Sequence, residues 1–208
     1  MNEIINNLNK IIPNPICELN YTCDYELLIA TVLSAQCTDK RVNEVTKVLF
    51  NKYKSIEQLK NAELVDIKKI ILPCGNFNKK SEYILAIANK LYYDQNGKVP
   101  NDFNYLLTLP GVGRKTINVV LSELFNVPTI AVDTHVERVS KRLNIVSPKD
   151  DILKIEKKLM KKIPKPQWNR VNHQLVLFGR YHCKSIKPDC SNCLLKKGCK
   201  YYEKNNKC

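Results

Sequence analysis

Four of the nine cysteines in this chain of 208 residues stand close together near the C-terminus. They are Cys183, Cys190, Cys193 and Cys199, with the spacing C-x6-C-x2-C-x5-C. In a chain without a secretory signal, clustered thiols hold metal more often than they form disulfides. Four thiolates suit either a tetrahedral Zn²⁺ ion or a cubane iron–sulfur cluster, and the spacing by itself does not separate the two. The sequence therefore predicts a metal centre of one of these kinds.

A second candidate site is the stretch Leu-Pro-Gly-Val-Gly-Arg-Lys at residues 109–115, between two helical segments. Its two glycines permit a left-handed backbone and a close approach to the main chain. The following helix begins with amides that have no acceptor within the helix, and these amides bind phosphate together with the helix dipole. The pattern favours a helix-hairpin-helix that binds DNA phosphate over a plain turn. The DNA contacts it predicts are Gly111, Val112, Gly113 and Arg114.

Lys115 and Asp133 are the candidate catalytic residues. Lys115 lies in the first helical turn after the hairpin, where the dipole and Arg114 disfavour a second positive charge. A lysine that loses its proton readily is an amine nucleophile, although a phosphate contact is the simpler role here. Asp133 follows an apolar run and precedes an amphipathic helix, so its simplest role is an N-cap, with Thr134 and Glu137 as an alternative capping box. His135 is expected to be structural.

The elements that position these residues are helices. Apolar residues recur with a helical period nearly throughout, so the predicted fold class is all-α. Only residues 129–132 look extended, and one such segment makes no sheet. A domain boundary is expected near residues 126–128, where a proline interrupts the chain. Helices are expected at residues 25–36, 39–53, 62–71, 78–94, 102–109, 114–125, 133–143, 150–163 and 167–181, with a short helix after Ser55.

The charge is positive and unevenly distributed. The chain has 34 Lys and Arg against 20 Asp and Glu, a net charge of +14. Residues 149–208 carry 16 basic and 5 acidic side chains, which indicates a polyanionic partner such as nucleic acid. A lysine-rich composition that only maintains solubility is the alternative. Apolar stretches are far shorter than the roughly 20 residues that a membrane span requires, and the N-terminal residues do not resemble a signal peptide.

The hairpin, the Asp133 segment and the cysteines, in this order and at these distances, resemble the endonuclease III family of DNA repair glycosylases. The resemblance covers nearly the whole chain. In this family the cysteine spacing implies a [4Fe–4S] cluster, and a lysine at position 115 implies a bifunctional enzyme that excises a base and cuts the strand. The further motifs that carry the resemblance are Leu27-Leu28-Ile29-Ala30, Leu33-Ser34-Ala35-Gln36, Thr129-Ile130-Ala131-Val132-Asp133-Thr134-His135 and Phe178-Gly179-Arg180-Tyr181.

The resemblance implies a role for each site residue. Lys115 would attack C1′ of a damaged pyrimidine nucleotide and form a Schiff base, after which β-elimination would cut the strand. Asp133 would activate Lys115 and stabilise the cationic sugar. The nucleotide must first leave the base stack, and Gln36 would fill the vacated space. Lys184 and Lys187, in a loop shaped by the cluster, would meet the phosphate backbone.

The resemblance also implies two helical domains with DNA across the cleft between them. A six-helix domain would span residues 18–126, and residues 1–17 with 127–208 would form the cluster domain, with Lys115 and Asp133 facing each other at the cleft mouth. The expected partner is double-stranded DNA with damaged pyrimidines or abasic sites, bound by a cytoplasmic, nucleoid-associated monomer. One departure is Asn76, which stands where the family has an apolar wedge; Phe77 is a possible substitute.

Other functions are also compatible with parts of the pattern. A monofunctional glycosylase of the same superfamily would lack a lysine at position 115. A non-catalytic helix-hairpin-helix module would carry a structural zinc ion and would be colourless, whereas an iron–sulfur protein is brown. An iron–sulfur electron carrier is disfavoured by the phosphate-binding hairpin and the positive charge.

Overall fold

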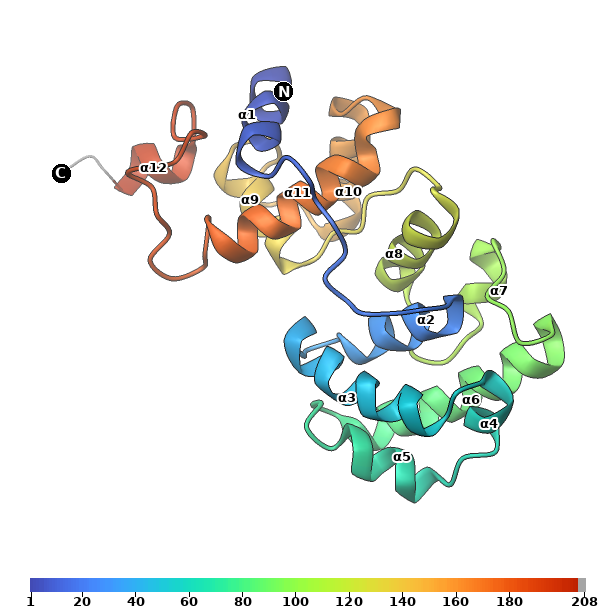
Figure 1. Ribbon diagram of the computed structural model, residues 1–208. Helices are drawn as coiled ribbons and strands as arrows, with labels where there is room; N and C mark the ends of the chain where they lie inside the picture. The colour runs from blue at the N-terminus through green and yellow to red at the C-terminus, as the bar shows by residue number, and fades with distance from the viewer. Residues whose placement is uncertain (206–208) are drawn as a thin grey trace. The chain divides into compact units, whose positions relative to one another are not determined.

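The computed structural model describes residues 1–205, and within this range the backbone forms helices, turns and loops without any strand. The predicted all-α fold class is confirmed. Figure 1 shows the order of the helices along the chain. Their bounds are α1 Asn2–Ile11, α2 Asp24–Leu33, α3 Asp39–Lys52, α4 Ile56–Lys60, α5 Leu64–Ile71, α6 Phe77–Gln95, α7 Phe103–Leu107, α8 Arg114–Phe125, α9 Thr134–Arg142, α10 Ile152–Lys162, the 3-10 helix η1 Lys165–Gln167, α11 Trp168–Tyr181 and α12 Lys200–Asn205.

The chain divides into two compact units. One is Glu18–Phe125, and the other joins Met1–Cys17 to the described part of Asn126–Cys208. The first unit contains seven helices, α2 to α8, of which α4 and α7 have only five residues each, whereas the resemblance implies a six-helix domain.

The unit Glu18–Phe125 is built around α2. Nearly every side chain of α2 is buried, and the helix contacts α3, α6 and α8. Each fully buried leucine or isoleucine contributes about 1.5–3 kcal/mol relative to an exposed one, so α2 is a main source of this unit's stability. Asp24 at its start accepts a hydrogen bond from the backbone N–H of Val99 at 2.7 Å, which attaches a distant loop to the helix.

Helix α2 is shorter than the sequence suggests. Its last residue is Leu33, whereas the apolar pattern predicts a helix to Gln36. Residues 34–37 form a turn in which Gln36 has φ 56°, a left-handed conformation that ends a helix. The prediction for residues 34–36 is therefore wrong, since no local signal marks this turn.

The second unit is built around α11, which contacts α9, α1 and η1. Helix α1, which the sequence analysis did not predict, buries Ile5 and Leu8 in the core of this unit. Polar contacts across the chain fix its end, since Arg170 donates to Pro13 O at 2.6 Å and Gln174 donates to Ile12 O at 3.0 Å.

Helices α9 and α11 pack closely because Gly179 lies between them. A Cβ atom at Gly179 would lie 2.8 Å from His135 Cβ and 3.1 Å from Val139 Cγ2. The absence of a side chain at Gly179 therefore permits α9, the helix that follows Asp133, to pack closely against α11. In the part of the chain that the structure describes, none of the helices combines the length and hydropathy required of a membrane-spanning segment.

Candidate functional site

The hairpin between α7 and α8 has a buried interior and an exposed rim. Asp102 caps α7 by accepting hydrogen bonds from the backbone N–H groups of Asn104 and Tyr105. Leu109 and Val112 are buried, and the N–H of Val112 donates to Leu109 O at 3.2 Å, which closes the turn. The exposed rim consists of Gly111, Gly113, Arg114 and Lys115. Since the Val112 side chain serves the core, only its backbone is available to a ligand.

The two glycines of the hairpin are required for different reasons. Gly111 has φ +74°, and a Cβ atom there would collide with the Tyr83 ring. Gly113 lies outside the left-handed region, and a Cβ atom there would meet nothing within 4 Å. The folded protein thus demands a glycine at position 111 but not at 113. A bare backbone at Gly113 suits a site where an external group must come close.

Helix α8 begins at Arg114, directly after Gly113, and its first turn contains no acidic residue. The amides and dipole at this end therefore attract an anion. The guanidinium of Arg114 lies 5.5 Å from the centroid of the Phe103 ring on α7. Lys115 is exposed in the first turn, where its amine is open to solvent.

Asp133 is the N-cap of α9. The buried run Ile130, Ala131 and Val132 leads into it, and its Oδ1 atom accepts hydrogen bonds from the N–H groups of His135 at 2.9 Å and Val136 at 2.8 Å. The capping role weighed for Asp133 is therefore confirmed. The alternative box is not formed, since Glu137 instead pairs with Lys141 at 2.6 Å. The half-buried carboxylate is held in a single orientation.

His135 follows Asp133 in α9 and packs against α11. Its Nδ1 atom lies 3.1 Å from Arg138 Nη2, and because a guanidinium can only donate, Nδ1 acts as an acceptor. Burial lowers the pKa of His135, and the positive charge of Arg138 acts in the same direction while Asp133 opposes it. A neutral imidazole in this contact fits the predicted structural role.

Gln36 is exposed in the turn after α2, and this turn lies against the start of α6. A Cβ atom on Gly75 would be 3.7 Å from Gln36 O, so the two backbones lie close together. Asn76, at the expected wedge position, is exposed with φ 57°, whereas Phe77 is half-buried. The structure thus brings Gln36 and Asn76 together on adjacent turns of one unit.

One residue of this region, Lys80, was not predicted from the sequence. Lys80 is only 4% exposed and donates hydrogen bonds to backbone carbonyls near the end of α2. It precedes Ile84 by four residues and Ile87 by seven, and both are buried on α6. That helical spacing already places Lys80 on the apolar face and could have identified it.

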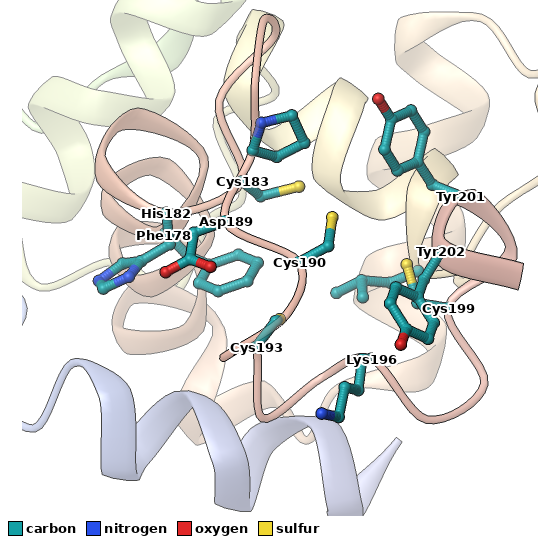
Figure 2. A pocket seen from close by; sticks show the side chains of 12 residues that line it. Phe178, His182, Cys183, Asp189, Cys190, Cys193, Lys196, Cys199, Tyr201 and Tyr202 are labelled. Carbon is teal, nitrogen blue, oxygen red and sulfur yellow. The ribbon is translucent and has the colours of Figure 1, made fainter. Parts of the chain in front are cut away.

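The four clustered cysteines line a single pocket. Figure 2 shows Cys183, Cys190, Cys193 and Cys199 around it, together with the rings of Phe178, Tyr201 and Tyr202. All four are free thiols; Cys183, Cys190 and Cys193 are half-buried, and Cys199 is buried. The N–H of Leu195 donates to Cys193 Sγ at 3.3 Å. The stack of Phe178 on His182, with centroids 5.7 Å apart, forms one wall of the pocket.

The donor set fits a metal cluster. Burial raises the pKa of Cys190 and Cys193, and the neighbouring thiols add to this, so unbound thiolates are costly here. A bound cation removes that cost because coordinating thiols lose their protons. Within residues 1–205, no three His, Cys, Asp or Glu side chains converge as the ligands of one metal ion do. All four cysteines line this one pocket.

Two arginines of α9 hold the loop that begins at Cys183. Arg142 donates to Cys183 Sγ at 3.4 Å and to Lys184 O at 2.7 Å, and its guanidinium lies 3.9 Å from the Tyr201 ring centroid. Arg138 donates to Cys183 O at 3.2 Å. Lys184 and Lys187 are exposed on this loop. The loop that carries two predicted phosphate contacts is thus connected to the helix that Asp133 caps.

The hairpin, the capped Asp133 and the cysteine pocket together define a class of helix-hairpin-helix DNA repair proteins. Residues 29–165 match the family described as "HhH-GPD superfamily base excision DNA repair protein". Within this superfamily the chain belongs to the endonuclease III family. It is 46% identical over 203 residues to Endonuclease III of Bacillus subtilis (strain 168), a match that covers 98% of this chain and 93% of the relative. The resemblance found in the sequence is confirmed.

Two solved structures agree with this assignment. "Structure of a Trapped Endonuclease III-DNA Covalent Intermediate: Estranged-Adenine Complex" has a TM-score of 0.93 at 46% identity and covers 97% of this chain and 94% of that one. "Structure of a non-covalent Endonuclease III-DNA Complex" has a TM-score of 0.95 at 46% identity and covers 98% and 95%. Both are similar to this chain over almost its full length.

Proposed function

We propose that this chain is a bifunctional DNA repair enzyme, a DNA glycosylase that also cleaves the strand as an AP lyase. The observation that carries the proposal is Lys115, an exposed amine in the first turn of α8, directly after the hairpin that we propose binds phosphate. The covalent DNA intermediate of a 46% identical relative is the species that such an amine would form. A monofunctional glycosylase has no lysine at this position, so that alternative is disfavoured.

The proposed chemistry begins with Lys115. Its Nζ forms a bond to C1′ while the bond from C1′ to the damaged base breaks, and the base leaves with the bonding electrons and takes up a proton. Loss of the nitrogen proton and opening of the sugar give a Schiff base. Removal of a proton from C2′ then expels the 3′ phosphate, which cuts the strand. No outside oxidant is needed.

Asp133 is proposed to stabilise the cationic sugar and to help activate the amine. Its cap supports this role, because two backbone N–H groups fix the carboxylate without neutralising its charge. A preorganised charge is effective because no reorganisation is needed as the reaction proceeds.

The proposed substrate is double-stranded DNA with an oxidised pyrimidine or an abasic site, bound by a monomer at the nucleoid. Phosphate would be held by the backbone of Gly111, Val112 and Gly113 and by the side chain of Arg114. Lys184 and Lys187 would contact the backbone further along. Gln36 would enter the space left by the extruded nucleotide, since enzymes that act on a base must take it out of the stack.

The proposed cofactor is a [4Fe–4S] cluster held by Cys183, Cys190, Cys193 and Cys199. Two observations support this cofactor: the four cysteines line one pocket, and their C-x6-C-x2-C-x5-C spacing is the one that implies such a cluster in the endonuclease III family. When bound, the cluster would supply a rigid charged centre that orders the loop of Lys184 and Lys187. Stoichiometric zinc in protein made under anaerobic, iron-replete conditions would contradict this cofactor.

The experiment that tests the function uses duplexes carrying defined lesions. The purified protein is incubated with each duplex, with and without borohydride, and base release, strand cleavage and covalent adduct are measured together. We expect all three on oxidised pyrimidines and only cleavage and adduct on a preformed abasic site. Base release without any adduct would instead indicate a monofunctional glycosylase.

A further inference from the structure

Lys80 is a buried lysine that the proposed chemistry does not use. Only 4% of its surface is exposed, and its ammonium group donates to Leu33 O at 2.9 Å and Ala35 O at 2.7 Å. Lys80 belongs to α6, whereas both acceptors belong to the end of α2 and the turn after it. Lysine is almost never buried in this way unless partners replace its lost hydration.

No charged partner accounts for the burial of the Lys80 ammonium group. Among the described residues no carboxylate pairs with Lys80, and its titratable neighbours are the thiols of Cys74 and Cys37. Burial raises the pKa of the Cys74 thiol to about 12, so this neighbour stays neutral. Burial also lowers the pKa of Lys80 itself. An apolar side chain of the same length would fill the site without this desolvation, so the reason for a lysine lies in the carbonyls that it holds.

Those carbonyls belong to the turn that presents Gln36. The last carbonyls of a helix have no partner within it, and a cation at this end satisfies them and complements the helix dipole. Leu33 O lies at the end of α2 and Ala35 O lies in the turn, one residue before Gln36, whose φ of 56° is left-handed. A residue other than glycine keeps such a conformation only when its surroundings hold it there.

Lys80 is also connected to the neighbouring turn. Its backbone N–H donates to Asn76 O at 3.1 Å, and Asn76 is itself left-handed with φ 57°. A Cβ atom on Gly75 would be in van der Waals range of Gln36 O, so the two turns lie close together. Lys80 thus holds the Gln36 turn with its side chain and the Asn76 turn with its backbone N–H group.

We infer that Lys80 is a positioning residue for base extrusion, which fixes the Gln36 turn against the Asn76 turn so that the two act on the base stack as one rigid unit. The inference rests on the proposed function, in which Gln36 fills the space left by the extruded nucleotide. Rigid support is most needed here because Asn76 is a small polar side chain where a bulky apolar wedge is expected.

The test compares one lesion in two settings. Single-turnover excision of an oxidised pyrimidine such as thymine glycol is measured opposite adenine and opposite an abasic spacer, where extrusion costs less because no pair is broken. For Lys80→Met we expect a loss of about ten-fold or more opposite adenine and less than about three-fold opposite the spacer. Borohydride trapping at a preformed abasic site opposite the spacer should stay near the wild-type rate. Lys80→Arg, which keeps a charged donor, should recover part of the loss.

Lys79→Met is the matched control, because Lys79 is the preceding residue of α6 with a side chain 63% exposed and paired with Glu82 at 3.5 Å. Lys79→Met should excise at the wild-type rate in both duplexes.

Two results for Lys80→Met would overturn the inference. Equal losses of excision rate in the two duplexes would show a merely structural role, and no loss in either would show no role at all. If Lys80→Met does not fold, Lys80→Gln is tested in the same way, and failure of both to fold also overturns it. If the wild-type protein showed neither excision nor trapping, the result would contradict the proposed function itself.

Discussion

At the scale of single residues, Asp133 caps α9 and is also proposed to act in the reaction, and the substitution Asp133→Asn separates these two roles. Asparagine keeps the cap, because its side-chain oxygen can accept from the same two N–H groups, but it removes the negative charge. We expect Asp133→Asn to lower base excision by at least about 10²-fold, the scale of a lost acid–base group, and to affect cleavage at a preformed abasic site less.

The control for that substitution is Asp151→Asn. Asp151 caps α10 in the same manner, with Oδ1 accepting from the Lys154 N–H at 2.8 Å, and it has no proposed role in the chemistry. Its excision rate should equal the wild-type rate. The test is single-turnover excision by both variants. Equal losses of rate in the two would contradict a role of Asp133 in the reaction.

The glycines of the hairpin give a second prediction at this scale. Gly111→Ala forces a side chain into the Tyr83 ring at a left-handed position, and we expect it to lower the free energy of unfolding by about 1–3 kcal/mol or more. Gly113→Ala meets no protein atom and should cost about 1 kcal/mol or less, yet weaken DNA binding because its methyl group would occupy space at the proposed phosphate site. Denaturant unfolding and DNA titration test the pair. Unchanged affinity in Gly113→Ala would contradict the proposed phosphate site.

At the scale of elements, the packing of α9 on α11 predicts a dependence of stability on pH. Burial lowers the pKa of His135 in the folded chain, so the unfolded chain binds a proton first as the pH falls. Stability should therefore be complete above about pH 6.5, the ordinary histidine value, and decline as the pH drops below it. His135→Gln should reduce that decline in urea titrations between pH 5 and pH 7. An equally steep decline in the variant would mean that other groups are responsible.

The same elements show what sequence can and cannot predict. The helical period located α3, α6 and α8 well, and Asp133 was identifiable as a cap because capping chemistry is local. The turn at Gln36 was not, since it depends on Lys80, which lies 44 residues away. Helix α1 was also missed, because its position is fixed by Arg170 and Gln174, more than 150 residues distant. The role of Arg142 could not be predicted either, because its five side-chain contacts are with four distant residues, three in the loop after α11 and one on α12.

At the scale of the whole molecule, the uneven charge predicts binding that is sensitive to salt. Each neutralised phosphate contributes about −0.9 to the slope of log affinity against log salt concentration, so ~4–6 contacts give a slope of roughly −4 to −5. Lys184→Ala and Lys187→Ala should each reduce the slope by about 1. DNA titrations from low to moderate salt test this. A slope near zero would contradict electrostatic binding of DNA. An unchanged slope in both variants would show that the loop carrying Lys184 and Lys187 does not contact DNA.

The central claim, that Lys115 is the nucleophile, is tested most directly by borohydride trapping on a duplex with an oxidised pyrimidine. Wild-type protein should give a covalent adduct that peptide mass spectrometry locates at Lys115. Lys115→Gln should give none while it still binds the damaged duplex, because the amine is lost and the hairpin phosphate contacts remain. An adduct that forms in Lys115→Gln at the wild-type rate would place the nucleophile elsewhere and contradict the account.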